Sequence, residues 1–140
     1  MIKTNHYILM TDQDLSIGKI LLAEDDQNQS EIIVSFLQNK GFQVSRVRDG
    51  EEGLNLLQKE TFDILLLDIL MPNKDGIWLL EQIRKNHKFD KLKIITFTNL
   101  SQGKQLDKVT HQGVTKILLK SDTSLAQLLK CINQTLAIGN

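Results

Sequence analysis

Short apolar runs alternate along the chain with segments that have a helical period. The runs that predict strands cover 20–23, 42–47, 62–67, 93–97 and 117–119. The segments between and after these runs carry apolar residues three and four positions apart, which is the spacing of one helix face. The clearest example is the last segment, with Leu125, Leu128, Leu129, Ile132 and Leu136. Strands that alternate with helices in this way are typical of a parallel sheet.

Polar residues predict where several of the helices begin. Asp49, followed by Glu52 three positions later, resembles a capping box, and Asp122 or Thr123 is expected to cap the final helix. Residues 102–111 predict only a weak helix, because few apolar residues anchor it and one glycine interrupts it.

Five predicted strands and five predicted helices favour a doubly wound α/β sheet, since right-handed crossovers place helices on both of its faces. This pattern covers residues 19–138, which we expect to form one domain. Residues 1–18 show no sustained period, and Ile8-Leu9-Met10 is their only apolar patch, so we interpret them as an N-terminal arm.

Composition narrows the class of protein. The chain has 17 basic and 17 acidic side chains, and this balance argues against direct binding of nucleic acid over a broad surface. No apolar run is long enough to span a membrane. The single cysteine, Cys131, excludes an internal disulfide and favours a cytoplasmic location. Neither Gly-x-Gly-x-x-Gly nor a P-loop is present, which disfavours nucleotide binding.

Polar side chains follow four of the predicted strands. Glu24 and Asp25 follow the first strand, Asp68 the third, Thr98 the fourth and Lys120 the fifth. The carboxyl ends of parallel strands meet at one edge of the sheet, so we expect these groups to lie together. Crowded carboxylates repel and need a cation, for which Mg²⁺ is the best suited. One of them could also attack a phosphoryl donor as a nucleophile.

Each of these residues also has an ordinary structural interpretation. Asp26 is better explained as a cap of the first helix than as a ligand. An aspartate at the end of a strand is often a turn residue, and a lone lysine is usually a solvated surface charge. The combination at successive strand ends is what favours a functional site.

Four stretches together resemble a known family: residues 19–26, 64–76, 94–99 and 113–120. The second contains Asp-x-x-Met-Pro-x-x-Asp-Gly, and the only proline of the chain lies in it. On these residues the chain resembles a two-component response regulator receiver domain of the single-domain, chemotaxis-regulator-like kind. The resemblance implies a flavodoxin-like fold, a five-stranded parallel sheet with strand order 2-1-3-4-5 and five helices, and no output domain.

The resemblance also implies roles for individual residues. Asp68 matches the phospho-acceptor, Thr98 the switch hydroxyl and Lys120 the ammonium that pairs with the phosphoryl group. The implied Mg²⁺ ligands are Glu24, Asp25, Asp68 and the main-chain carbonyl of Leu70.

The implied function is that of a phosphorelay response regulator. A sensor histidine kinase or a phosphotransfer protein would donate the phosphoryl group, and a separate downstream protein would receive the signal. The chain would catalyse only its own phosphotransfer and autodephosphorylation, so we do not expect an enzyme that acts on other substrates. A homodimer through the face of the fourth helix, fifth strand and fifth helix is a further expectation.

Some positions depart from the family pattern and keep an alternative open. Ile117 stands where the family usually has an aromatic residue, and Ser121 stands where it usually has proline. These changes motivate a phosphorylation-independent interaction module as the alternative. Leu70 and Leu100 stand where the family often has polar groups that position water. This suggests either a long-lived phosphoryl group or two side chains that face solvent or packing and matter little. Leu70 also disfavours a phosphohydrolase, which usually has an acid there.

Overall fold

The computed structural model describes residues 16–100 and 102–138 of the chain. Its centre is a parallel sheet of five strands in the order β2-β1-β3-β4-β5, which confirms the predicted flavodoxin-like architecture. The strands are β1 (Lys19–Ala23), β2 (Gln43–Val47), β3 (Ile64–Leu67), β4 (Lys93–Thr98) and β5 (Lys116–Leu119).

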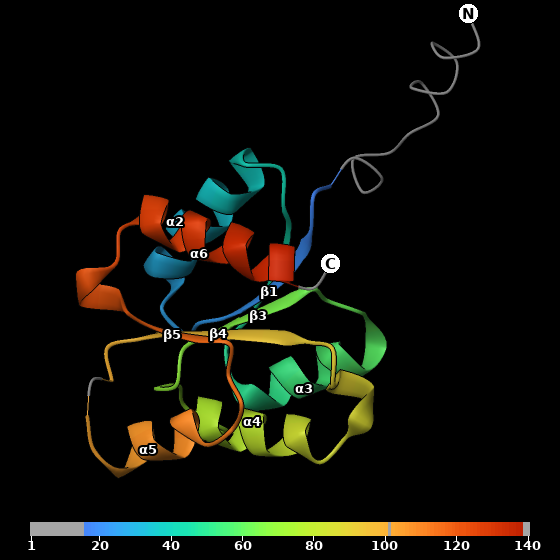
Figure 1. The fold of residues 1–140 in the computed structure, drawn as a ribbon, viewed down its shortest axis with the longest axis vertical. Coiled ribbons are helices and arrows are strands. Elements are labelled where there is room, and N and C mark those ends of the chain that lie inside the picture. Colours follow the sequence, from blue (N-terminus) through green and yellow to red (C-terminus); the bar gives the residue numbers. More distant parts are fainter. Residues whose placement is uncertain (1–15, 101, 139–140) are drawn as a thin grey trace, which may run out of the picture.

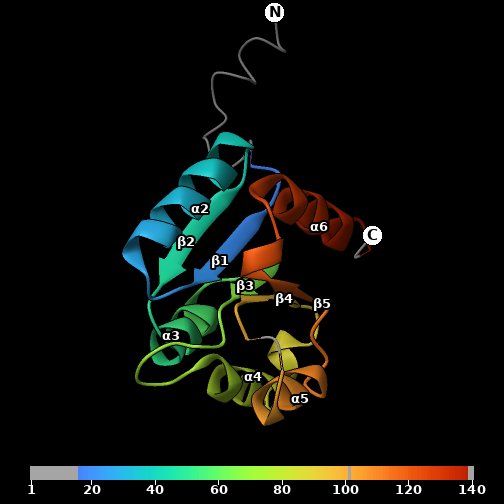
Figure 2. The ribbon, with the colours of Figure 1, turned by 90° about the vertical axis from the view of Figure 1, so that its left-hand side faces the viewer.

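Helices cover both faces of the sheet, so the domain has three layers (Figure 1). α2 and α6 lie on one face, and α3, α4 and α5 lie on the other, as the turned view also shows (Figure 2). The α-helices are α2 (Gln27–Asn39), α3 (Gly50–Lys59), α4 (Gly76–Arg84), α5 (Lys104–Thr110) and α6 (Leu125–Ile138). The short 3₁₀ turns are η1 (His87–Phe89) and η2 (Lys120–Asp122).

Alternation along β1 explains why the sheet is covered twice. Leu21 and Ala23 belong to the core cluster under α3 and α4, whereas Ile20 and Leu22 belong to the cluster under α2 and α6. All four side chains are buried, because successive residues of a strand point to opposite faces. A strand without a polar face can lie only inside a sheet that is covered on both sides.

Three aspartates start helices by accepting a hydrogen bond from a main-chain N–H three residues on. Asp26 caps α2, Asp49 caps α3 and Asp75 caps α4. This confirms the structural interpretation of Asp26 and half of the predicted capping box. The other half differs, because the Glu52 carboxylate accepts the N–H of Arg48 rather than that of Asp49.

The cap of α6 corrects the prediction of Asp122 or Thr123. The hydroxyl of Ser124 accepts the N–H of Gln127, and the Gln127 side chain accepts the N–H of Ser124 in return. Asp122 belongs instead to the preceding turn η2. The physical reason is that Ser124 and Gln127 form a complete capping box, which satisfies two helix-terminal N–H groups at once.

Other boundaries differ from the prediction by one or two residues. Phe42 and Phe62 precede β2 and β3 as buried core residues rather than opening the strands. The weak helix predicted over 102–111 is confirmed as α5, which has no side-chain cap and follows Gly103 at φ 99°.

Of the predicted arm, residues 1–15 lie outside the described residues. Ile17 donates a hydrogen bond to the carbonyl of Gly41 at 3.1 Å.

Candidate functional site

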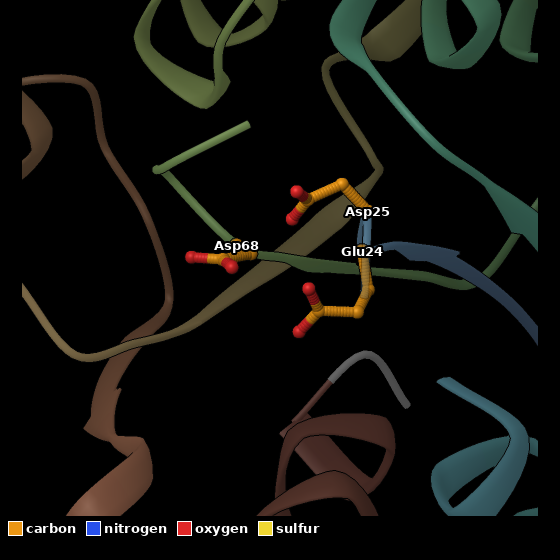
Figure 3. A group of neighbouring side chains, drawn as sticks. All are labelled: Glu24, Asp25 and Asp68. Carbon is orange, nitrogen blue, oxygen red and sulfur yellow. The ribbon is translucent and has the colours of Figure 1, made fainter. Parts of the chain in front are cut away.

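The carboxyl ends of β1 and β3 bring three carboxylates together. Glu24 and Asp25 directly follow β1, and Asp68 directly follows β3, which is the neighbour of β1 in the sheet. One carboxylate oxygen from each residue lies within 4.8 Å of the others. Figure 3 shows the three carboxyl groups gathered around a common space at this edge of the sheet.

Two main-chain hydrogen bonds fix these residues relative to the strands. The Glu24 N–H donates to the carbonyl of Val47 at 3.0 Å, and the Asp68 N–H donates to that of Ala23 at 3.0 Å. Both bonds continue the strand pairing by one residue, so the sheet itself sets the separation of β1 and β3 at the site. Glu24 is 2% exposed and Asp68 7%, whereas Asp25 is exposed.

Lys120 reaches the site from the other end of the chain. It follows β5 directly, and its Nζ donates to the Asp68 carboxylate at 2.9 Å and to the Glu24 carboxylate. The sequence separation from Glu24 is 96 residues, so only the sheet order brings the two groups into contact. The ammonium therefore bridges the two buried carboxylates.

Burial and charge act against each other in this cluster. Burial raises the pKa of Glu24, although the Lys120 ammonium and the N–H of Asp26 partly counter it. For Lys120, burial alone would lower the pKa, but the carboxylates of Glu24 and Asp68 outweigh it and hold the pKa above its usual value. Three carboxylates and one ammonium leave two formal negative charges, which a divalent cation would neutralise.

Leu70 lies two residues beyond Asp68, in the loop that leads to α4. Its N–H donates to the Asp68 carboxylate at 3.2 Å, which orients that side chain. The Leu70 side chain is 49% exposed, whereas Leu100 packs against the core. Leu70 therefore faces solvent and Leu100 packs against the core, and a long-lived phosphoryl group stays a prediction.

A glycine lets α4 begin directly against the loop that follows β3. A Cβ at Gly76 would lie 2.7 Å from the Ile69 Cα and 2.8 Å from the Asp68 carbonyl oxygen. The Gly76 N–H also donates to the Ile69 carbonyl at 2.9 Å. Asp75 caps the helix and Gly76 permits this close approach, which is the physical reason for the Asp-Gly pair in the motif.

Thr98 lies on β4, which is the strand next to β3, and its side chain is fully buried. Its hydroxyl accepts the N–H of Leu100 at 3.2 Å. The structure thus brings Glu24, Asp25, Asp68 and Lys120 together. The hydrogen bond of the Thr98 hydroxyl in the structure is to Leu100, in the loop after β4.

The two departures beside Lys120 have distinct structural consequences. Ile117 is half-buried and packs against the core under α3 and α4. The Lys120–Ser121 peptide bond is trans, and the chain forms the turn η2 at this point. A trans bond is expected for a chain that lacks proline there, because a non-proline cis bond is costly.

Arg46 is a site residue that sequence reasoning missed. Its guanidinium donates to the main-chain carbonyls of Glu24 and Asp25, at 3.0 Å each. Nothing in the sequence around Arg46 indicates that its side chain contacts the loop after β1.

Comparison with known proteins identifies the family. The profile of the response regulator receiver domain matches residues 20–133. The chain belongs to this family. Receiver domains are signalling modules rather than classical enzymes, and they generally bind Mg²⁺ at an acidic pocket. They also interact with histidine kinases. The residues present fit that ion, since carboxylate oxygens cluster here with an excess of negative charge.

Several curated relatives are longer regulators. The chain is 37% identical to the regulatory protein VanRc of Enterococcus gallinarum over 92 residues, which are 66% of this chain and 38% of the relative. It is 38% identical to the transcriptional regulatory protein CpxR of Escherichia coli K12 over 93 residues, again 66% of this chain and 38% of the relative. The chain thus spans well under half the length of these relatives.

Solved structures agree on the fold. A CheY-like receiver domain protein of Methanospirillum hungatei JF-1 is 25% identical with a TM-score of 0.81, over 89% of this chain and 97% of that one. The BeF3-activated receiver domain of Klebsiella pneumoniae RstA is 27% identical with a TM-score of 0.76, over 84% and 97%. In the part of this chain that the structure describes, no helix is both long and apolar enough to cross a membrane.

Proposed function

We propose that this receiver domain is a phosphorylation switch whose acceptor is Asp68. The observation that carries the proposal is the buried contact of the Asp68 carboxylate with Lys120, beside the acidic pair Glu24 and Asp25. A carboxylate that is fixed by an ammonium and by a main-chain N–H is oriented for attack on a phosphoryl donor.

In the transfer, an Asp68 oxygen attacks phosphorus while the bond from phosphorus to the donor's imidazole nitrogen breaks. The product is an acyl phosphate on Asp68, and the imidazole nitrogen leaves with the bonding electron pair. The donor is the phosphohistidine of a sensor histidine kinase or of a phosphotransfer protein. Glu24, Asp25, Asp68 and the Leu70 carbonyl would hold Mg²⁺, which supplies positive charge to the phosphoryl oxygens.

The residues of the chain account for the remaining steps. Lys120 already contacts Asp68, so it is placed to pair with the phosphoryl oxygens that appear there. Those oxygens also provide a new acceptor for the Thr98 hydroxyl, which is now tied to Leu100. Because this hydroxyl can donate to the phosphoryl group while it still accepts the N–H of Leu100, a shift of Thr98 toward Asp68 would draw along the loop after β4, and with it α5, which has no side-chain cap.

The signal would then reach a separate partner through the surface around α5, β5 and α6, which is also where we place a homodimer. Direct binding of nucleic acid is not part of the proposal, and neither is a membrane. Cys131 is a buried free thiol, which suits the cytoplasm as the working compartment.

Intact mass spectrometry after treatment with phosphoramidate and Mg²⁺ tests the proposal. The wild type should gain the mass of one phosphoryl group, and Asp68→Asn should gain none. The matched control is Asp63→Asn, an exposed aspartate on the approach to β3, which should label like the wild type. If folded wild type gains no mass, the better interpretation is a phosphorylation-independent interaction module, which Ile117 and Ser121 motivate.

A further inference from the structure

Arg46 connects β2 to the loop that carries the acidic pair. Its Nε donates to the Glu24 carbonyl at 3.0 Å, and a terminal nitrogen donates to the Asp25 carbonyl at 3.0 Å. Arg46 pairs with Leu22 in the β1–β2 register, so it lies one residue short of the end of its strand and reaches forward over the end of β1. The side chain is half-buried in this position.

We propose that Arg46 is a positioning residue for the divalent cation site, because it fixes the main chain that carries Glu24 and Asp25. This inference rests on the proposed function, in which those carboxylates bind Mg²⁺. The guanidinium is a planar, rigid fork, so two hydrogen bonds to consecutive carbonyls define the orientation of both peptide groups.

Asp25 depends on this anchor more than Glu24 does. The Glu24 carboxylate is held by Lys120 and accepts the N–H of Asp26 at 3.1 Å. Within residues 16–100 and 102–138, by contrast, the Asp25 side chain is exposed and accepts no hydrogen bond. The position of its carboxylate is therefore set by its main chain, and Arg46 holds that main chain through the Asp25 carbonyl.

Sheet hydrogen bonding cannot replace Arg46 here. The bond from the Glu24 N–H to Val47 is the last of the β1–β2 pairing, and α2 begins only at Gln27. Between the strand and the helix, the carbonyls of Glu24 and Asp25 need partners of their own. The Arg46 side chain supplies both.

Two physical effects of Arg46 on cation binding have opposite signs. As a positioning group, Arg46 preorganises the ligands, and loss of such a supporting contact typically weakens metal affinity about 10- to 100-fold. As a positive charge near the site, it repels a cation, so its loss would strengthen binding. The sign of the change in affinity therefore distinguishes positioning from simple electrostatics.

The choice of ion adds a second distinction. Mg²⁺ demands nearly octahedral coordination at short distances, whereas Ca²⁺ accepts irregular and longer coordination. Loss of preorganisation should therefore weaken Mg²⁺ binding more than Ca²⁺ binding. A general loss of folded protein would reduce both in the same proportion.

The experiment measures dissociation constants for Mg²⁺ and Ca²⁺ by calorimetry on the full chain. We expect Arg46→Gln to bind Mg²⁺ about tenfold more weakly, with a smaller loss for Ca²⁺. Arg46→Lys, which can donate to only one carbonyl at a time, should fall in between. The matched control is Arg48→Gln, which removes the same charge from an exposed position two residues on and should stay within about twofold of the wild type.

The variant Asp25→Asn distinguishes a failure of the positioning role of Arg46 from a failure of the proposed metal site itself. If Asp25→Asn weakens Mg²⁺ binding but Arg46→Gln leaves it unchanged or makes it tighter, the positioning role is wrong and the site stands. The same holds if Arg46→Gln weakens Mg²⁺ and Ca²⁺ equally. If the wild type binds no Mg²⁺, or Asp25→Asn binds it as well as the wild type, the proposed metal site is itself wrong. Arg46→Lys keeps the test valid should Arg46→Gln fail to fold.

Discussion

Replacement of Lys120 by methionine should destabilise the domain strongly in the absence of a divalent cation. The variant keeps most of the volume of the side chain and removes only the ammonium. Glu24 and Asp68 would then stay buried with neither their bridging partner nor a cation. Their side chains are 2% and 8% exposed, so water cannot replace the lost contact without local opening.

The size of the effect follows from the contact geometry. At the 2.9 Å between Lys120 Nζ and Asp68 Oδ2, with an effective dielectric constant of about 20, the attraction is about 6 kcal/mol. Desolvation offsets part of this, and breaking a buried pair costs about 3–5 kcal/mol in practice. We therefore expect a loss of about 3 kcal/mol in the free energy of unfolding, or about 10 °C in Tm.

Urea unfolding followed by the fluorescence of Trp78, the only tryptophan, measures this loss. The experiment is run in EDTA and again in saturating Mg²⁺, which should restore part of the stability because the cation neutralises the same carboxylates. Lys116→Met is the control, since Lys116 is exposed on β5 and should cost no more than about 0.5 kcal/mol. A loss in EDTA no larger than that of Lys116→Met would refute the reasoning that the ammonium compensates buried charge.

Three further predictions concern packing, capping and pH. Gly76→Ala forces a Cβ onto the main chain of Asp68 and Ile69, and should cost about 1–3 kcal/mol by thermal unfolding; a neutral result would show that α4 can shift away freely. Ser124→Ala should cost about 1 kcal/mol, while Asp122→Ala should have no comparable effect, and equal losses would contradict the assignment of the cap. Burial raises the pKa of Glu24 above its usual 4.5, so folding stability should fall as pH rises from that value through the raised one. Glu24→Gln should remove this fall in urea midpoints measured in EDTA, and an unchanged pH profile would contradict it.

The sequence pattern predicted the parts of the site that follow from the order of the strands. Apolar runs located the ends of β1, β3 and β5, and parallel pairing then placed Glu24, Asp68 and Lys120 at one edge. That inference needs no side-chain detail, because a parallel sheet brings all its carboxyl ends to the same side. The prediction was therefore accurate although the contact joins residues 96 positions apart.

Features that depend on the direction of one side chain were not predictable in this way. Arg46 binds main-chain carbonyls, which every residue has, so no residue type in the loop identified its partner. Thr98 is the last residue of β4 rather than the residue after the strand, and its hydroxyl accepts the N–H of Leu100, a contact that the strand pattern does not predict. The cap of α6 was predictable in principle from the Ser-x-x-Gln pattern at Ser124, which competed with two other polar residues just before it.

The most direct test of the central claim locates the phosphoryl group on the chain. After treatment with phosphoramidate, borohydride converts an aspartyl phosphate to homoserine, and peptide mass spectrometry identifies the position. We predict homoserine at Asp68 when Mg²⁺ is present and unmodified aspartate there when EDTA replaces it. Homoserine at another aspartate, or the same yield at Asp68 in EDTA, would contradict the account.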